Sequence, residues 1–552
     1  MISKTRPYFN LLVLLAVCYF LFSFRIGAHD LWSPDEPRYA QVAREMLETG
    51  DWIVPHLNGE VYQEKPPLYF WLVAYISRPL GDVNETTARF PSAIAATLIV
   101  LGTYLFGRRI LGEREAFLGS LIAATSAQYL WIGRIGVIDM LLALSILASL
   151  ICFYFGHAKR RPPLYVAGYL FLVPAALSKG PVGIAVPVVV MLTFLAVEIV
   201  LRKESGKKQL AWFMGCTIIG LVLVGVCVGP WWRAAYERSD GVYGSLSLLK
   251  QQTEGRMFQS YSHRQPIYYY LMQILWQLFP WTVFLPLSAY AIKREGKLRE
   301  NQGLRFLLVW FLSVFLFFTL ISGKRSQYIL PSFPAAGLIL GWALVNSNPD
   351  EGRLSERRKF GIPLLLLSLG FAGSLIAASA AAYLRRPEYL TTALGTLVVS
   401  TAILVVLIRH CLSRPPRTAL ACLIGSTTLL VAVLFGYGAP LADRYNSARP
   451  FCSSVLAATG ASDSLFFYKI YRPNVHFYMH RRMSRLESGA DVKEALDKSR
   501  RVLLILQNRD RVALDLGPSY NTEEVARARI GSRDLICVAV KLAPAIGPIA
   551  IN

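Results

Sequence analysis

Charged residues are scarce in this chain: Asp, Glu, Lys and Arg make up 17% of its 552 residues, and hydrophobic residues make up 54%. Soluble domains carry about 25% charged residues, so the composition excludes a protein that is water-soluble throughout, and it also excludes a disordered chain or a collagen-like fibre. Eight cysteines are too few for a disulfide scaffold, and none form a CxxC pair. The sequence also lacks a Walker loop and a GxGxxG motif, so it carries neither of these signatures of nucleotide binding.

Basic residues outnumber acidic ones, 58 against 35, for a formal net charge of +23. Such a balance fits nucleic acid, a membrane surface or an anionic substrate, and the long apolar runs favour the membrane over nucleic acid. A helix that crosses the bilayer needs about 20 apolar residues, and about 13 stretches approach this length. We predict spans over approximately 8–25, 87–107, 116–133, 135–156, 164–178, 182–201, 210–231, 267–291, 304–322, 326–345, 360–384, 389–408 and 418–437.

The basic clusters of the loops alternate with these spans. If the N-terminus is cytoplasmic, the clusters within 108–114, 159–161, 202–208, 293–305, 353–359 and 409–417 all fall on the inside, as the positive-inside rule requires. The C-terminus then lies outside. The apolar stretch at 8–25 is longer than the core of a secretory signal, so we expect an uncleaved first span.

Three regions lie largely outside the spans: loops 26–86 and 232–266, and the tail 438–552. We therefore expect a transmembrane domain over 1–437 that carries both loops, and a small α/β domain over 438–552 on the outer face. Strands are predicted over 464–470, 501–506 and 535–540, with helices over 492–499 and 523–530. Cys452 and Cys537 lie in the tail, where they either form a disulfide or remain thiols.

The first loop contains two acidic residues at a predicted helix start, in Trp-Ser-Pro-Asp-Glu-Pro-Arg-Tyr-Ala. Ser33 and Glu36 have the spacing of a capping box, and Pro34 suits the first helical position. We expect an amphipathic helix lying on the membrane surface. Asp35 and Glu36 either only cap this helix or take part in chemistry. A cap needs one acid, which Glu36 supplies, so capping does not account for Asp35.

The same loop continues with Tyr-Gln-Glu-Lys-Pro-Pro-Leu-Tyr, residues 62–69. The two prolines can start a second short helix over 68–77. Lys65 stands at its mouth, where it either anchors to headgroups as many lysines do or binds an anionic lipid.

Other polar residues fall near the outer ends of spans. Asp139 either pairs with Arg134 or faces the outer cavity as a second carboxylate. Residues 178–181, with Lys179, and 322–328 are predicted outside turns. The second turn carries Lys324, Arg325 and Tyr328, which either bind a phosphate or are simply solvated. Loop 232–266 adds three further candidate partners for phosphate or carboxylate, namely Arg256, His263 and Arg264.

A metal site has weaker support, because no HExxH or paired Cys/His spacing is present. The outside candidates are Glu64, His56 and His476. No cofactor is firmly implied, although a divalent metal stays open. Since the long extramembrane segments face away from ATP and nucleotide sugars, group transfer there needs a donor already in the membrane, and a polyprenyl-phosphate-linked sugar meets that need.

The two loop motifs, the His-Arg-Gln-Pro…Tyr-Tyr-Tyr segment and Ser-Gly-Lys-Arg…Tyr resemble the integral-membrane (GT-C) glycosyltransferases. Within them the chain is most similar to the lipid A 4-amino-4-deoxy-L-arabinose transferases of the protein-mannosyltransferase-related superfamily. The resemblance implies a GT-C fold and transfer of aminoarabinose from undecaprenyl phosphate to a lipid A phosphate. It further implies the periplasmic face of a bacterial inner membrane and resistance to polymyxin and cationic peptides. We expect a monomer.

The resemblance also implies roles for the candidate residues. The catalytic acids would be Asp35, Asp139 and Glu36. The donor phosphate would be held by Lys65, Arg256, Tyr328, Lys324 and Arg38, and the substrate cavity would be lined by Tyr62, Glu64, His263 and Arg264.

The expected reaction is an inverting displacement at the anomeric carbon. With a phosphate acceptor Asp35 would orient a substrate or stabilise charge, and with a hydroxyl acceptor it would be a general base. Two alternatives stay open: another polyprenyl-phosphate-sugar transferase of the protein O-mannosyltransferase type, and, from a different class, a lipid transporter.

Overall fold

The computed structural model describes residues 2–32, 34–202, 204–244, 264–346, 416–460, 463–499, 501–512, 514 and 516–543. The chain divides into two compact units. Unit 1 comprises Met1–Phe24, Pro91–Glu237 and Gly244–Leu434, and unit 2 comprises Arg25–Phe90, Arg238–Tyr243 and Phe435–Asn552. The first long loop and the tail, which lie at opposite ends of the sequence, therefore belong to the same unit.

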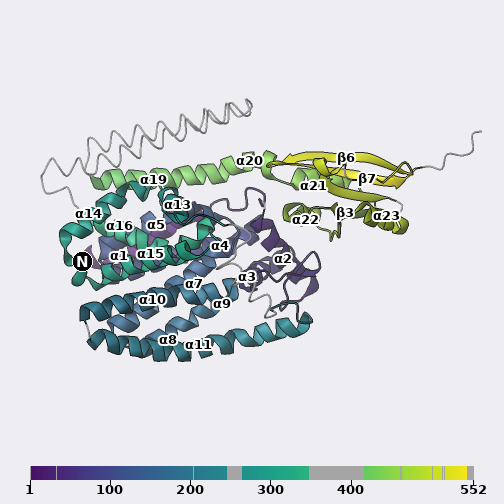
Figure 1. The fold of residues 1–552 in the computed structure, drawn as a ribbon. Helices are drawn as coiled ribbons and strands as arrows, with labels where there is room; N and C mark the ends of the chain where they lie inside the picture. Colours follow the sequence, from purple (N-terminus) through teal and green to yellow (C-terminus); the bar gives the residue numbers. More distant parts are fainter. Residues whose placement is uncertain are drawn as a thin grey trace, which may run out of the picture. The chain divides into compact units, whose positions relative to one another are not determined.

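All the named elements in the described part of unit 1 are helices (Figure 1). Its elements are α1 (Ile2–Cys18), η1 (Tyr19–Ser23), α4 (Glu85–Ile110, whose first turns belong to unit 2), α5 (Glu113–Ala124), α6 (Ala127–Arg134), α7 (Asp139–Ala158), α8 (Pro162–Leu170), α9 (Leu172–Lys179), α10 (Pro181–Arg202), α11 (Glu204–Arg238), α13 (Tyr269–Gln277), η3 (Trp281–Phe284), α14 (Leu285–Glu295), η4 (Lys297–Arg299), α15 (Gln302–Leu320), η5 (Ser326–Ser332), α16 (Phe333–Asn346) and α19 (Pro416–Val433). The short η8 (Leu434–Gly438) follows α19 and belongs to unit 2 from Phe435 on.

These helices match the predicted spans in position. Each predicted span has a helix or a pair of helices at its place, except 360–384 and 389–408, which lie outside the described residues. Within the described part of the chain, seven helices are long and apolar enough to cross a membrane, or up to nine if each bent pair is one span. The chain is therefore a multi-pass membrane protein.

Two of the spans are broken. The α5–α6 pair bends by 64°, and the α13–α14 pair bends by 107°. At the first break the hydroxyls of Thr125 and Ser126 donate to the carbonyls of Leu121 and Ile122, which are four residues back. Such bonds compete with the helical ladder and bend helices. At the second break Pro280 brings no backbone N–H and ends the helical run.

Helices α5 and α16 pack at very short range through glycine. A Cβ atom placed on Gly119 of α5 would lie 2.8 Å from the backbone oxygen of Gly337 in α16. Side chains at these positions would push the two backbones apart, so small residues permit the close helix packing that is common in membranes.

Unit 2 combines short helices with two sheets (Figure 1). Its elements are α2 (Asp35–Thr49), β1 (His56–Leu57), β2 (Glu60–Val61), α3 (Leu68–Ser77), η2 (Arg78–Leu80), α20 (Ala439–Asn446), α21 (Arg449–Ala457), β3 (Ser464–Tyr468), α22 (Pro473–Met479), β4 (Arg485–Leu486), α23 (Gly489–Lys498), β5 (Val502–Gln507), η9 (Asn508–Asp510), β6 (Tyr520–Ile530) and β7 (Arg533–Leu542).

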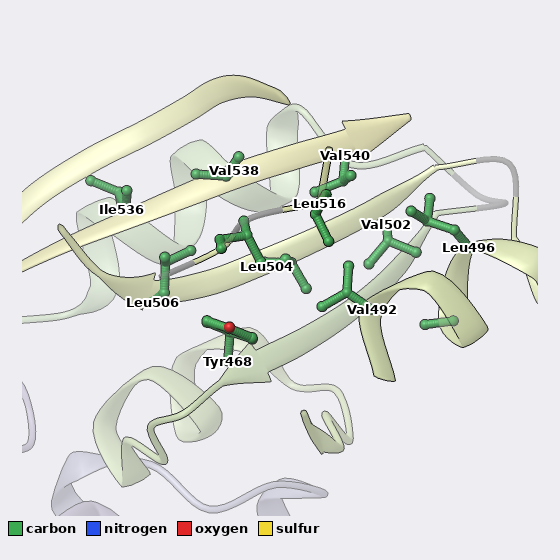
Figure 2. Close-up of a cluster of buried hydrophobic side chains, with 12 residues drawn as sticks. Tyr468, Val492, Leu496, Val502, Leu504, Leu506, Leu516, Ile536, Val538 and Val540 are labelled. Carbon is green, nitrogen blue, oxygen red and sulfur yellow. The ribbon is translucent and has the colours of Figure 1, made fainter. Parts of the chain in front are cut away.

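The larger sheet has the strand order β4-β3-β5-β7-β6. Strand β3 runs parallel to β4 and β5, while β7 runs antiparallel to β5 and β6. Alternate residues of β5 and β7 form its core with α23, as Figure 2 shows: Val502, Leu504, Leu506, Ile536, Val538, Val540, Val492 and Leu496. Because strand side chains alternate between faces, the residues of β5 and β7 in this set lie on one face of the sheet.

The predicted strands over 464–470, 501–506 and 535–540 and the helix over 492–499 are confirmed as β3, β5, β7 and α23. The predicted helix over 523–530 is wrong, because these residues belong to strand β6 and extend to its end. Alanine, glutamate and arginine favour helix as single residues, but pairing with β7 overrides that preference. Strand β6 is the edge of the sheet and is mostly exposed, and its charged side chains suit an edge strand.

Both cysteines of the tail are free. Cys452 in α21 and Cys537 in β7 are buried thiols, so no disulfide joins them. The Cys452 Sγ lies 3.6 Å from the carbonyl oxygen of Val475, to which it donates. Burial raises the pKa of the Cys537 thiol to about 12, which keeps it protonated and unreactive at neutral pH.

Candidate functional site

Helix α2 places the two acids of the first loop in its first turn. Pro34 is the N-cap, so the helix begins one residue later than predicted, and Ser33 of the expected capping box lies outside the described residues. Negative charge is favourable in the first turn of a helix. The helix ends at Gly50, whose φ of 70° is the left-handed conformation that glycine adopts without strain.

Asp35 belongs to a cluster of four side chains in unit 2. Arg38 Nη1 lies 3.6 Å from Asp35 Oδ1 and 3.5 Å from Glu64 Oε2. The Tyr62 hydroxyl donates to the same Glu64 oxygen at 3.3 Å. The structure thus brings together residues that the sequence separates by nearly thirty positions, and we call Asp35, Arg38, Tyr62 and Glu64 the acidic-loop cluster.

The protonation states in this cluster follow from burial and charge. Burial and the charge of Glu64 raise the pKa of Tyr62, so its phenol is neutral at pH 7. Burial alone would lower the pKa of Arg38, but Tyr62, Glu64 and Asp35 together raise it above its ordinary value. The Asp35 side chain is 21% exposed. The cluster therefore presents a carboxylate next to a fixed cation at a partly open position.

Glu36, the neighbouring acid, has a different environment. It is 5% exposed, and its two oxygens accept from Arg89 Nε at 2.7 Å and Nη2 at 3.1 Å. Arg89 also donates to the carbonyls of Ile26, His29 and Asp30. Both oxygens of Glu36 are thus engaged inside the protein, so the geometry assigns Glu36 to holding α2 in place.

Lys65 precedes α3, and the predicted helix over 68–77 is confirmed with the same bounds. The backbone carbonyl of Lys65 accepts a hydrogen bond from the buried hydroxyl of Tyr243 at 2.9 Å. Tyr243 follows α11 in the chain and lies in unit 2 with Lys65. The segment that carries Lys65 is therefore fixed by a residue almost 180 positions away.

Asp139 belongs to a second cluster, in unit 1. Its Oδ1 lies 2.5 Å from Lys179 Nζ, and the two side chains are 8% and 12% exposed. Lys179 Nζ also lies 4.6 Å from the ring centroid of Tyr328. Arg134 donates instead to the carbonyls of Leu21 and Phe24. We call Asp139, Lys179 and Tyr328 the lysine cluster.

Lys324 faces inward. It is 5% exposed, and its ammonium donates to the carbonyls of Gln265 and Ile321 at 3.2 and 2.6 Å. Burial lowers its pKa. Because two of its three donors are engaged on the backbone, Lys324 supports the 321–325 turn. Arg264 is exposed and pairs with Gly323 in an isolated bridge, while Arg256 and His263 lie outside the described residues.

The metal candidates do not converge. Among the described residues, no group of three or more His, Cys, Asp or Glu side chains is placed to hold an ion. His476 is fully buried, and its Nδ1 lies 2.9 Å from the Tyr471 hydroxyl. Glu64 belongs to the acidic-loop cluster, and His56 is in strand β1.

Sequence reasoning missed the roles of Lys179 and Arg89. Lys179 carried one signal, since it is a basic residue on the predicted outer face, against the charge trend of the loops. Arg89 gave no signal, because an arginine near the start of a span resembles an ordinary interfacial residue. Its burial and its acidic partner emerge only in the folded chain.

Part of the chain matches a known protein family. Residues 8–234 match the model of the dolichyl-phosphate-mannose-protein mannosyltransferase family. The crystal structure of ArnT from Cupriavidus metallidurans bound to undecaprenyl phosphate has a TM-score of 0.76 at 20% identity, over 97% of this chain and 98% of that one. The chain therefore has the GT-C fold that the sequence predicted.

Two curated relatives carry the same name, undecaprenyl phosphate-alpha-4-amino-4-deoxy-L-arabinose arabinosyl transferase. The protein of Yersinia enterocolitica is 30% identical over 64% of each chain, which is less than two thirds of its length. The protein of Edwardsiella ictaluri is 30% identical over 79% of this chain and 77% of its own. By this similarity, the chain belongs to the family of undecaprenyl phosphate-4-amino-4-deoxy-L-arabinose arabinosyl transferases.

Proposed function

We propose that the protein transfers 4-amino-4-deoxy-L-arabinose from undecaprenyl phosphate to the phosphate groups of lipid A. The observation that carries this proposal is membership of a family whose relatives bear that activity in their names. The acidic-loop cluster supports it, because Asp35 beside Arg38 is a charged pair suited to a reaction between two anionic lipids.

The reaction is a displacement with inversion at the anomeric carbon. An oxygen of the lipid A phosphate forms the new bond to this carbon, and the bond to the donor phosphate breaks, so undecaprenyl phosphate leaves with its electron pair. The nucleophile is already an anion and needs no strong base. Asp35 orients the sugar's ammonium or stabilises positive charge at the anomeric carbon, which is the kind of fixed electrostatic help that lowers a barrier most.

Cations are needed where the departing phosphate gains charge. Lys65 and Arg38 are candidates for this task. Lys179, which lies beside Tyr328, is another. Arginine can hold a phosphate through two parallel hydrogen bonds, whereas lysine acts as a point charge. Arg256 keeps its predicted role as a further phosphate ligand.

The membrane setting is part of the proposal. The distribution of basic residues favours an N-terminus in the cytoplasm, with loop 26–86 and tail 438–552 in the periplasm of a bacterial inner membrane. The transferred sugar carries an ammonium group, so it lowers the negative charge of lipid A. The product should therefore bind polymyxin and other cationic peptides less well.

Mass spectrometry of lipid A tests the proposal. Cells that make the donor but lack their own transferase would express the wild-type chain, Asp35→Asn or the matched control Asp497→Asn, an exposed acid of α23. We expect one added aminopentose per modified phosphate with the wild type and the control, and none with Asp35→Asn.

Other products would point elsewhere. A hexose on protein would favour the mannosyltransferase type, to whose family model residues 8–234 match. Movement of a lipid between leaflets without any new covalent product would favour a transporter. A well-expressed wild-type chain that adds nothing to lipid A would refute the aminoarabinose assignment.

A further inference from the structure

Three consecutive residues just before α2 are held by the tail of the chain. The backbone N–H of Asp30 donates to Asp443 Oδ2 at 3.0 Å, and the indole N–H of Trp32 donates to Asp443 Oδ1 at 2.8 Å. Between them, the backbone N–H of Leu31 donates to the Tyr478 hydroxyl at 2.7 Å. We call these contacts the tail clamp. All of its residues lie in unit 2.

The contact between Leu31 and Tyr478 is the buried part of the tail clamp. Leu31 is fully buried and Tyr478 is 6% exposed. The Tyr478 hydroxyl accepts from Leu31 and donates to Glu85 Oε1 at 3.0 Å, so it uses both of its hydrogen-bonding roles. A buried backbone N–H without an acceptor costs free energy comparable to a lost hydrogen bond. The segment is therefore tied to the tail.

The carboxylate of Asp30 adds a second attachment. Its Oδ2 accepts from the Ser447 hydroxyl at 2.6 Å, and its Oδ1 accepts from Arg449 Nε at 2.8 Å. Ser447 and Arg449 stand at the junction of α20 and α21. Both the backbone and the side chain of Asp30 are thus bound by the same short stretch of the tail.

The clamped segment leads directly to Asp35. The backbone N–H of Trp32 donates to Glu36 Oε2 at 3.3 Å, and Glu36 is in turn held by Arg89. Asp35 therefore lies between a segment fixed by the tail and a first helical turn fixed by Arg89. Small displacements of a reacting group are costly, since a misplacement of about 1 Å can lower a rate roughly a hundredfold.

We propose that Asp443 and Tyr478 are positioning residues, through which the tail sets the place of Asp35 in the transfer reaction. This inference rests on the proposed function. It assigns the tail a task in catalysis that does not require the tail to touch a substrate.

The test uses the full-length chain in membranes and two mild variants. Tyr478→Phe removes only the hydroxyl, and Asp443→Asn keeps the shape but alters the acceptors. Each should lower kcat for sugar transfer at least about tenfold while the KM for the donor stays within about twofold, because orientation is lost and binding is not. The matched controls are Tyr520→Phe and Asp497→Asn, which lie in the same tail outside the clamp and should leave both constants unchanged.

Hydrogen exchange supplies a readout that does not depend on the sugar. In Tyr478→Phe the amide of Leu31 loses its acceptor, so peptides that cover residues 30–32 should exchange at least about tenfold faster than in the wild type. Peptides from the β5–β7 core should be unchanged. Trp32→Phe combined with Asp443→Asn should cost no more activity than the worse single variant, since Asp443→Asn already alters the acceptor of the Trp32 indole N–H.

The outcomes separate the two proposals. If the wild type transfers no aminoarabinose, the proposed function fails, and the exchange data alone decide whether the tail holds the loop. If exchange at 30–32 rises while an active enzyme keeps its kcat, the positioning role is refuted. Unchanged exchange in both variants would refute the clamp itself.

Discussion

The guanidinium of Arg89 lies 2.7 Å from the carboxylate of Glu36, Nε to Oε1, and both side chains are buried. This pair joins the first turns of α4 and α2, so it fixes the helix whose first residue is Asp35. The adjacent acids of the first loop thus have different surroundings: Glu36 is buried against Arg89, whereas Asp35 is partly exposed.

Removal of one member of this pair should destabilise the protein strongly. Arg89→Met leaves the buried charge of Glu36 without its partner, a change that typically costs about 3–5 kcal/mol. We expect a lower thermal unfolding midpoint in detergent, followed by tryptophan fluorescence. The matched control is Arg233→Met, whose partner Glu237 is exposed, and it should unfold like the wild type. An unchanged midpoint for Arg89→Met would contradict the structural role.

The lysine cluster should act as one unit. Lys179→Met is expected to lower the rate of lipid A modification by roughly a hundredfold, the size typical for loss of one group that stabilises developing charge. Asp139→Asn should also lower it, because the carboxylate holds the ammonium at 2.5 Å. The double variant should be no slower than the slower single one. Independent, multiplying losses would show that the two side chains work separately.

The protein should become less stable as the pH decreases, in part because His476 takes up a proton. Burial lowers its pKa from 6.5 to about 4, and Glu45, which raises the pKa, is offset by Arg44 and Arg482. The unfolded chain binds this proton more readily than the folded one, so the contribution to stability is fully present above about pH 6.5 and is lost as the pH falls through about 4.

The variant His476→Gln removes that titration. Its unfolding midpoint should decrease less than that of the wild type between pH 7 and pH 4. Comparison of the two proteins cancels the carboxylates, which titrate in both. Parallel pH profiles would indicate that His476 has an ordinary pKa.

The two tail cysteines should react only after unfolding. Mass spectrometry of peptides from protein alkylated in denaturant without reductant should find Cys452 and Cys537 as separate alkylated residues. In the native protein both should be protected, since burial raises the pKa of both thiols. A cross-linked pair of peptides would contradict the free thiols described here.

Local pattern predicted much of this fold. Two prolines followed by an apolar run predict the helix over 68–77, and short apolar runs predict the tail strands. Strand β6 was missed because its pairing with β7, and not its own composition, decides its conformation. Composition describes a segment by itself, and an edge strand is specified largely by its neighbour.

The site was only half predictable for a related reason. Asp35, Lys65 and Asp139 stand out because charge near a membrane span is unusual. Arg89, Asp443 and Tyr478 look ordinary in sequence, and their partners lie 53 to 447 positions away. No periodicity connects such distant residues, so only the folded chain identifies them.

The tail clamp also orders events during synthesis. Residues 30–32 leave the ribosome early, whereas Asp443 and Tyr478 follow more than 400 residues later. A nascent or truncated chain that stops before residue 443 therefore contains Asp35 and the helices of α1 to α19 but lacks the partners of the clamp. Asp35 acquires its observed surroundings only when translation has passed residue 478. If Asp35 has its proposed role, incomplete products left in the membrane would carry the motif without the activity.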